Sequence, residues 1–203
     1  MSVLLARHGE TDWNTAKRIQ GTTDIPLNDN GLKQAQLLYQ SLAGEKVNVS
    51  RIYCSRQKRA LKTAGTVGAY YKAPVQVIPG LEEMNFGIFE GHTWEEIAAL
   101  YPDELDQWQS DKRYHRVPDG ESCQDLLERL FLAFEQIAGE AEVATSAGDD
   151  ILIITHGMVI LSLLTLQDDL DFGTSYKMIN IENARAIKFE WNKIWEIRQK
   201  LQA

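Results

Sequence analysis

Three short apolar runs, each followed at once by polar residues able to do chemistry, constrain this fold more than any other feature of the sequence. The runs, with the segments that follow them, are Val3–Ala6 with Arg7–Gly9, Arg51–Cys54 with Ser55–Arg59, and Ile151–Thr155 with His156–Gly157. Short apolar runs bounded by polar residues are typical of buried strands. Because ligands of parallel sheets lie beyond the carboxyl ends of the strands, we expect the three polar segments to meet in one pocket.

Amphipathic segments alternate with these runs and predict helices. They are Gly31–Leu42, Gln57–Tyr71, a long segment capped by Ser122 that carries Leu126 to Ile137, and about 158–166. Strands that alternate with helices predict an α/β fold with a largely parallel sheet.

The remaining segments give three further structural predictions. Val75–Ile78 is expected to be a third strand. Thr93–Glu96 has the pattern of a capping box, and Pro102 is expected to close the short helix that follows it. Two apolar segments, Ala184–Trp191 and Ile194–Ile197, flank Asn192 and Lys193, which predicts a closing hairpin.

Length and composition narrow the class of protein. With 203 residues, the chain is expected to form a single domain over residues 1–203. A formal net charge of -8 argues against nucleic acid or an anionic membrane surface as a partner. The N-terminus does not resemble a signal peptide, and the apolar region 151–166 is too short and broken to span a membrane. Because Cys54 and Cys123 also give no disulfide framework, we expect a cytoplasmic protein.

One stretch of this acidic chain is basic. Residues 51–62 contain five Lys or Arg side chains and no acid, whereas residues 81–110 contain eight acids and no Lys or Arg. Two solvated faces explain most of these charges, but a local basic patch also suits an anion. Arginine is well matched to phosphate, because its planar fork makes bidentate, charge-assisted hydrogen bonds.

Five ordered segments carry a recognisable pattern. They are Leu4–Asn14, Ser55–Ala64, Leu81–Gly91, Gly120–Ser122 and Thr155–Gly157, with Gly21, Asp24, Pro26, Leu27 and Gly31 between the first two. Their order and spacing closely resemble those of the histidine phosphatase superfamily, the phosphoglycerate-mutase-like proteins. The resemblance implies a three-layer α/β/α fold and phosphoryl transfer by way of a phosphohistidine.

The resemblance also implies a role for each matching residue. The catalytic positions are His8, Glu83, His156, Arg7 and Arg59, and the substrate-binding positions are Arg7, Asn14, Gln20, Gly21, Arg59 and His156. His8 would take the phosphoryl group, because splitting one difficult displacement into two eases each step. Glu83 would protonate the leaving group and then activate water. Since the arginines of this family neutralise the phosphate charge, we expect no metal ion and no cofactor.

Simpler interpretations stand beside these assignments. His8 and His156 taken singly would fit core histidines, and it is their place in the ordered motifs that favours a site. Glu82 competes with Glu83, although Glu83 matches the motif. Four other polar residues are expected at the surface: Arg56, Lys58, His92 and His115.

Three functions remain open at this point. They are a metal-independent phosphatase of small phosphomonoesters, a cofactor-dependent phosphoglycerate mutase, and a non-catalytic phosphate-binding protein on the same fold. The complete set of catalytic positions argues against the third. Family mutases carry an arginine after the acid, where this chain has Met84, and a longer basic segment that helps to exclude water.

The sequence therefore favours a phosphatase acting on a small phosphorylated metabolite, similar to small bacterial members such as alpha-ribazole phosphatase and the broad-specificity phosphatases. Its specificity is expected to lie in residues 90–120. There a group of side chains either forms a lid or simply packs: Trp94, Trp108, Tyr114, His115 and Arg116.

Overall fold

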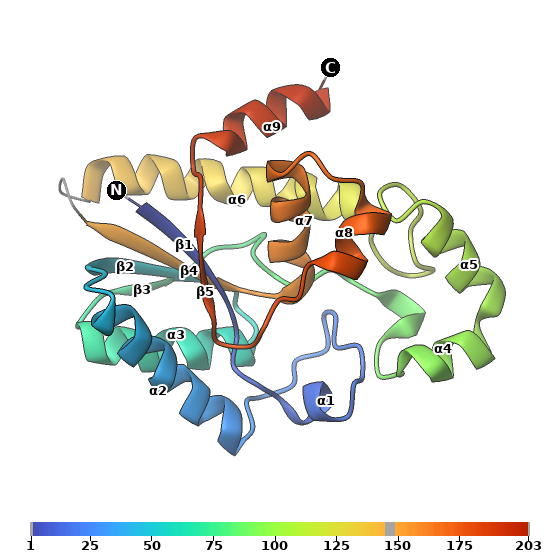
Figure 1. The fold of residues 1–203 in the computed structure, drawn as a ribbon, viewed down its shortest axis with the longest axis horizontal. Helices are drawn as coiled ribbons and strands as arrows, with labels where there is room; N and C mark the ends of the chain where they lie inside the picture. Colours follow the sequence, from blue (N-terminus) through green and yellow to red (C-terminus); the bar gives the residue numbers. More distant parts are fainter. Residues whose placement is uncertain (1, 145–148, 203) are drawn as a thin grey trace.

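Residues 2–144 and 149–202, which the computed structural model describes, form a five-stranded sheet in the order β3-β2-β4-β1-β5 (Figure 1). The strands are β1 Ser2–Arg7, β2 Val49–Cys54, β3 Val75–Val77, β4 Asp150–Thr155 and β5 Ala186–Phe189. β1 to β4 are parallel, and β5 is antiparallel to β1. The predicted α/β fold with a largely parallel sheet is confirmed.

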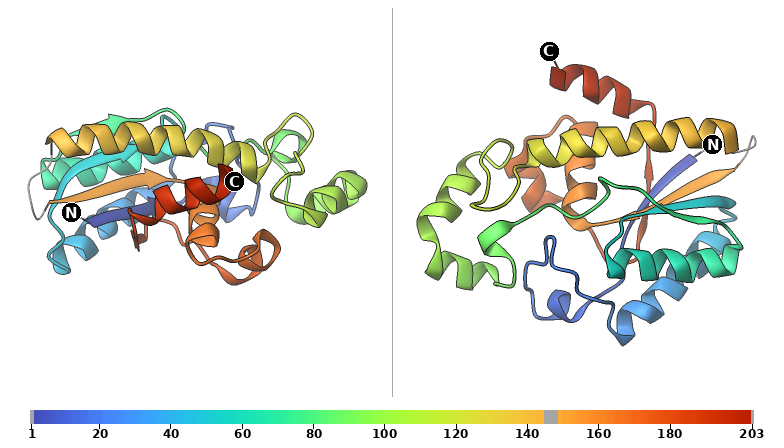
Figure 2. Two further views of the ribbon diagram at one scale, coloured as in Figure 1. Left: turned by 90° about the horizontal axis from the view of Figure 1, so that it is seen from above. Right: turned by 180° about the vertical axis from the view of Figure 1, so that it is seen from behind.

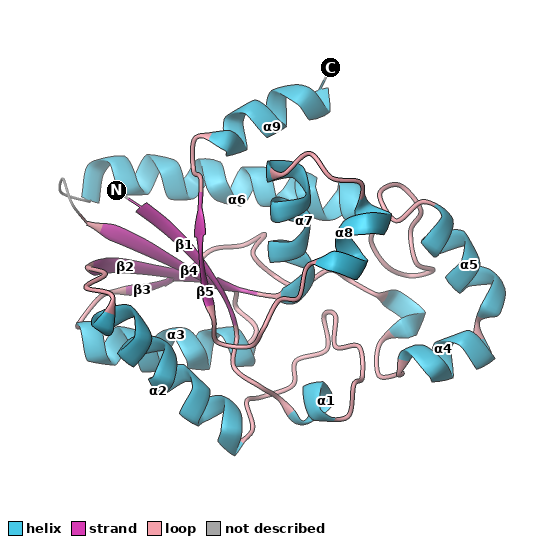
Figure 3. Ribbon diagram, in the orientation of Figure 1, coloured by secondary structure: helices cyan, strands magenta, loops and turns pink. Residues whose placement is uncertain are grey.

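Helices cover both faces of the sheet and give three layers (Figure 3). α2 Asp29–Gly44 and α3 Lys58–Tyr71 lie on one face, and α6 Cys123–Ala144 and α7 Gly157–Gln167 lie on the other. The three-layer α/β/α architecture implied by the motifs is therefore confirmed. Within the described ranges, no helix has both the length and the apolar character to span a membrane.

Side chains that alternate along β1 divide the core in two. Leu4 and Ala6 pack in the cluster shared with α2 and α3, whereas Val3 and Leu5 pack in the larger cluster shared with α6 and α7. Successive side chains of a strand point to opposite faces, so a strand covered on both faces is apolar throughout. This is why the first strand appears in the sequence as an unbroken apolar run.

The register of β1 and β4 brings the two histidine segments together. Arg7 is paired with Thr155, and the His8 amide donates to the Thr155 carbonyl at 3.0 Å. β2 lies on the other side of β4 and ends at Cys54, directly before the basic segment. The three polar segments thus leave the sheet at the same edge, as expected.

Shorter elements surround this edge of the sheet (Figure 2). They are α1 Asp12–Thr15, a 3-10 helix Gly87–Phe89, α4 Trp94–Leu100, α5 Pro102–Ser110 and α8 Phe172–Met178. The capping box that begins α4 is present, with Thr93 Oγ1 accepting from the Glu96 amide at 3.2 Å. Pro102 follows α4 as expected but also begins α5, because proline suits a first helical position, where its missing N–H is not needed.

The predicted closing hairpin is wrong. β5 pairs with β1 rather than with a following strand, and residues after Asn192 form α9 Lys193–Gln202. Ile194 is fully buried in the core on the α6 and α7 side, and its neighbour Trp195 packs partly buried against the same core. Two consecutive apolar residues can share one side of a helix, whereas in a strand they would face opposite sides.

Candidate active site

A cavity of about 570 Å³ lies beyond the carboxyl ends of the central strands. Seven of the eight residues singled out from the sequence line it, namely Arg7, His8, Asn14, Gln20, Gly21, Arg59 and Glu83. The eighth, His156, is fully buried beside His8, with the two ring centroids 5.2 Å apart. The polar segments of β1, β2 and β4 therefore meet at one place.

The His8 ring has a defined hydrogen bond. Its Nδ1 lies 2.7 Å from the Gly9 carbonyl oxygen. Because a carbonyl can only accept, Nδ1 carries the proton, and in the neutral ring Nε2 keeps its lone pair. The Gly9 amide is itself fixed, since it donates to Thr63 Oγ1 at 3.0 Å. The ring is therefore held with an unprotonated Nε2.

Both histidines are kept uncharged by their surroundings. Burial, followed by the positive charges of Arg7 and Arg59, lowers the pKa of His8 well below its ordinary value. Burial, followed by Arg59 and by His8 itself, lowers the pKa of His156 in the same direction. Neither His156 ring nitrogen has a hydrogen-bond partner among the described residues. A neutral imidazole has one donor and one acceptor to offer to a ligand.

Of the three arginines that line the cavity, Arg7 and Arg59 are the two whose charges act on His8. Arg59, near the start of α3, is fully buried, and it donates from Nη1 to the Thr23 carbonyl and from Nη2 to the Gly21 carbonyl, both at 2.8 Å. Arg7 donates from Nη1 to the Ile181 carbonyl at 2.8 Å. Since a guanidinium has five N–H donors, these contacts fix the Arg59 plane and leave donors for an anion. Across residues 2–144 and 149–202, no cluster of three or more His, Cys, Asp or Glu suits a metal ion.

The turn that carries Gln20 and Gly21 is held by Glu90. The Glu90 carboxylate accepts from the Thr22 amide at 2.7 Å and from the Thr23 amide at 3.0 Å. Gly21 has a φ of 50°, and a Cβ at this position would collide with the Glu90 side chain. A glycine is therefore required here, and its carbonyl is directed at Arg59.

Asn14 lines the cavity, and its amide oxygen is occupied. Its Oδ1 accepts from the Thr11 amide at 3.0 Å and from Thr11 Oγ1 at 3.1 Å, in the capping box of α1. The amide oxygen is thus occupied, and Nδ2 is the group left to donate. This geometry agrees with the donor role that the motif implies for Asn14.

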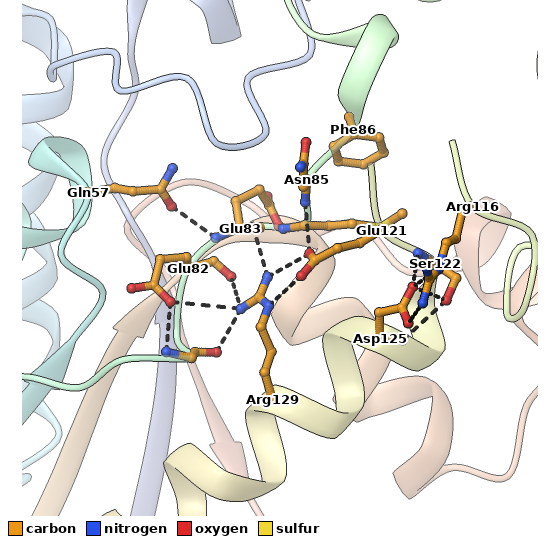
Figure 4. Close-up of polar contacts among 12 residues, drawn as sticks. Gln57, Glu82, Glu83, Asn85, Phe86, Arg116, Glu121, Ser122, Asp125 and Arg129 are labelled. Carbon is orange, nitrogen blue, oxygen red and sulfur yellow. Dashed lines mark hydrogen bonds and ion pairs between the residues drawn. The ribbon is translucent and has the colours of Figure 1, made fainter. Parts of the chain in front are cut away.

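The two adjacent carboxylates have different surroundings (Figure 4). Glu83 lines the cavity, and its Oε1 accepts from the amides of Met84 at 3.0 Å and Met158 at 3.2 Å. Glu82 accepts from the Gly80 amide at 2.7 Å and forms an ion pair with Arg56 at 3.1 Å. Of the pair, Glu83 is the one directed into the cavity.

Burial also has the largest effect on the pKa of the Glu83 carboxyl. It raises the pKa of Glu83 above its ordinary value, although the two backbone donors and the charges of Arg59 and Arg7 act in the opposite direction. A carboxyl with a raised pKa can carry a proton nearer to neutral pH, which is what a general acid requires.

Two residues that the sequence did not reveal also hold the site. Gln57 accepts from the Glu83 amide at 2.9 Å and donates to the Gly21 carbonyl at 2.9 Å, so it links the acid to the Gly21 turn. Asn183 lines the cavity and donates to the His8 carbonyl at 2.9 Å. Gln57 occupies an unspecified position of its motif, and Asn183 lies 175 residues from His8 in no motif, so neither had a sequence signal.

The four polar residues expected at the surface are all exposed or partly exposed. The Arg56 and Lys58 side chains are 77% and 69% exposed, as expected of solvated residues. His115 is exposed, and the His92 side chain is partly exposed beside Glu96.

The side chains proposed for a lid have separate environments. Trp94 lines the cavity, as do the apolar side chains of Phe86, Met158 and Leu161. Trp108 is buried in the core, and three others lie outside the cavity lining, namely Tyr114, His115 and Arg116.

The sequence model of the histidine phosphatase superfamily (branch 1) matches residues 3–196, which include every site residue described above. The chain belongs to the histidine phosphatase superfamily. The resemblance carried by the five motifs is confirmed, and with it the expectation of an enzyme of the phosphatase class.

Relatives of this histidine phosphatase include two proteins of Arabidopsis thaliana. The chain is 34% identical to phosphoglycerate mutase-like protein 4 and 35% identical to a metal-independent phosphoserine phosphatase, each over 163 residues. These matches cover 79% of this chain and 68% and 66% of the two relatives. Among solved structures, the alpha-ribazole phosphatase from Shigella flexneri is similar with a TM-score of 0.77 at 26% identity, over 94% of this chain and 90% of that one.

Proposed function

We propose that this histidine phosphatase hydrolyses small phosphomonoesters through a phosphohistidine on His8. The observation that carries the proposal is the hydrogen bond from His8 Nδ1 to the Gly9 carbonyl, which leaves the Nε2 lone pair at a cavity shared with Arg7, Arg59 and the Glu83 carboxyl. A neutral nucleophile, cationic donors and a protonated acid are the groups that transfer from a phosphomonoester requires.

In the first step, His8 Nε2 attacks phosphorus, so that an N–P bond forms while the ester P–O bond breaks. Glu83 gives its proton to the departing alkoxide. Arg59 and Arg7 neutralise the non-bridging oxygens, with His156 and Asn14 as further donors. Because the Arg59 plane is already fixed by two backbone carbonyls, its donors need little reorganisation as charge moves.

In the second step, the Glu83 carboxylate takes a proton from a water molecule. The water oxygen forms a bond to phosphorus, and the N–P bond breaks. Inorganic phosphate leaves, His8 returns to its neutral form, and Glu83 is again protonated. One carboxyl serves as acid and then as base, as microscopic reversibility requires.

The acceptor of the phosphoryl group separates a phosphatase from a mutase. A mutase returns the group to another hydroxyl and must keep water away from the phosphohistidine. Met84, where family mutases have an arginine, is fully buried and does not line the cavity, so it adds no charge there. Similarity to a metal-independent phosphoserine phosphatase supports the same conclusion. The proposed substrate is a small phosphorylated metabolite, and residues 90–120 are proposed to contribute to its selection through Trp94.

Phosphate release from a panel of substrates tests this function. The panel covers sugar phosphates, phosphoserine, phosphoglycerates, nucleotides and alpha-ribazole phosphate, each with and without EDTA. We expect release of inorganic phosphate at the same rate in both conditions, because arginines rather than a cation meet the phosphate charge. Conversion of 3-phosphoglycerate to 2-phosphoglycerate faster than phosphate release would instead identify a mutase. Activity lost with EDTA and restored by a divalent metal would contradict the proposed mechanism.

The Arg59→Ala substitution should lower kcat/KM by about 10²- to 10³-fold, on the scale of losing one preorganised donor to the transition state. Arg56→Ala is the matched control, because Arg56 lies in the same segment but its side chain is exposed and pairs with Glu82. Initial rates of the wild type and the two variants, measured with one substrate, give the change in kcat/KM. Equal rates for Arg59→Ala and the wild type would remove Arg59 from the phosphate site.

A further inference from the structure

Arg129, on α6, lies outside the cavity lining but contacts the loop that carries Glu83 (Figure 4). Its Nη1 donates to the carbonyls of Gly80 at 2.8 Å and Glu82 at 2.9 Å, and its Nη2 donates to the carbonyl of Glu83 at 2.9 Å. One guanidinium therefore binds three carbonyls within four consecutive residues of this loop.

The remaining donors of Arg129 bind the Glu121 carboxylate. Nε donates to Oε1 at 2.9 Å and Nη2 to Oε2 at 3.0 Å, in a bidentate pair. Glu121 in turn accepts from the Asn85 amide at 2.9 Å and donates its own amide to the Asn85 carbonyl at 2.8 Å. Arg129 and Glu121 thus fix the main chain on both sides of Glu83, and the five donors of the guanidinium are all used.

Close packing leaves the loop little room to move against α6. Gly80 has a φ of 95°, and a Cβ at this position would lie 2.7 Å from the carbonyl oxygen of Arg129. On the opposite side, Gln57 accepts from the Glu83 amide at 2.9 Å. The Glu83 main chain is therefore bound at its N–H by Gln57, the residue before α3, and at its C=O by Arg129 of α6. These contacts fix the point from which the Glu83 side chain reaches into the cavity.

We infer that Arg129, held by Glu121, is the positioning residue of the general acid, and that it acts on leaving-group protonation by fixing the main chain of Glu83. The inference rests on the proposed role of Glu83. Arg129 reaches Glu83 through a backbone carbonyl, and the charges that act most on the Glu83 carboxyl are those of Arg59 and Arg7. We therefore expect Arg129 to act through the position of the Glu83 carboxyl and not through the charge of the guanidinium.

Leaving-group dependence separates this role from a merely structural one. The test compares kcat for 2-glycerophosphate, whose alkoxide needs a proton, with kcat for p-nitrophenyl phosphate, whose phenolate barely needs one. Arg129→Lys keeps the charge but cannot span three carbonyls and a carboxylate with a single ammonium. We expect it to lower kcat for 2-glycerophosphate about tenfold more than kcat for p-nitrophenyl phosphate, since small displacements of a catalytic group can cost up to about 10²-fold.

The selective loss of kcat for 2-glycerophosphate should be larger in Arg129→Met and smaller in Glu121→Gln than in Arg129→Lys. Arg56→Met is the matched control, because Arg56 also contacts this loop but only through the Glu82 side chain. Its ratio of the two kcat values should equal that of the wild type. Circular dichroism and thermal melting identify the variants that are folded. If Arg129→Met does not fold, the comparison rests on Arg129→Lys.

A double variant tests whether Arg129 acts through Glu83. Residues that act as one unit are not additive, so Arg129→Lys should lower 2-glycerophosphate turnover less than twofold further in a Glu83→Gln enzyme. Equal losses on both substrates in folded Arg129→Lys, or full additivity with Glu83→Gln, would overturn the inference. A Glu83→Gln enzyme that itself lacks the selectivity would overturn the proposed role of Glu83, and this inference with it.

Discussion

Replacing His8 with alanine should abolish turnover of every phosphomonoester while leaving the protein folded. The substitution removes the atom that forms the N–P bond, so the loss should be far larger than for a binding residue, roughly 10⁶-fold on the scale known for covalent nucleophiles. The fold should tolerate it, because the main chain at His8 is held by backbone contacts to Thr155 and Ala184 and by the side chain of Asn183. Initial rates and circular dichroism of the purified variant measure the two effects.

The covalent intermediate gives a second readout of the same residue. Wild-type enzyme mixed with substrate and quenched in base should carry a phosphoryl group that is stable to base and labile to acid, as expected for a phosphohistidine. The His8→Ala enzyme should carry none. His115→Ala is the control, because His115 is exposed and does not line the cavity. A fully active His8→Ala enzyme would end the proposal.

Local patterns in the sequence predicted the elements of the fold well where one pattern is clear, either an amphipathic period or an unbroken apolar run. β1 and β4 were predictable because strands covered on both faces are apolar throughout. The hairpin at residues 184–197 failed because a short apolar run such as Ile194 and Trp195 fits either a helix or a strand, and long-range pairing decides. β5 pairs with β1, and no local pattern reveals a pairing between segments so far apart in the sequence.

Ordered motifs likewise predicted the residues of the candidate site better than the contacts that hold them. The spacing of the motifs singled out Glu83 over Glu82, and the two carboxyls do face different surroundings. Arg129 carried no signal, because its partners on the loop of Glu83 are backbone carbonyls 46 to 49 residues away, and any residue type offers a carbonyl. Sequence patterns record side-chain chemistry, whereas the arrangement of main-chain acceptors appears only in the folded protein.

The Glu83→Gln substitution should slow the cleavage of poor leaving groups far more than that of good ones. General acid catalysis contributes about 10²- to 10⁴-fold, and glutamine has no acidic proton to give. The kcat for 2-glycerophosphate should fall within that range, whereas the kcat for p-nitrophenyl phosphate should fall much less, because the nitrophenolate leaves without a proton. Glu82→Gln is the matched control, since Glu82 is adjacent but pairs with Arg56 outside the cavity. If Glu82→Gln shows the selective loss and Glu83→Gln does not, the acid has been assigned to the wrong carboxyl.

The pH dependence of kcat/KM adds an independent test of Glu83. The acid must be protonated and His8 must be neutral, so activity should extend from the lowered pKa of His8 up to the raised pKa of Glu83. Above the Glu83 pKa the carboxyl loses its proton, and cleavage of 2-glycerophosphate should fall as the pH rises. In Glu83→Gln this alkaline fall should disappear while the acid limb set by His8 remains. An unchanged alkaline limb in Glu83→Gln would assign that proton to another group.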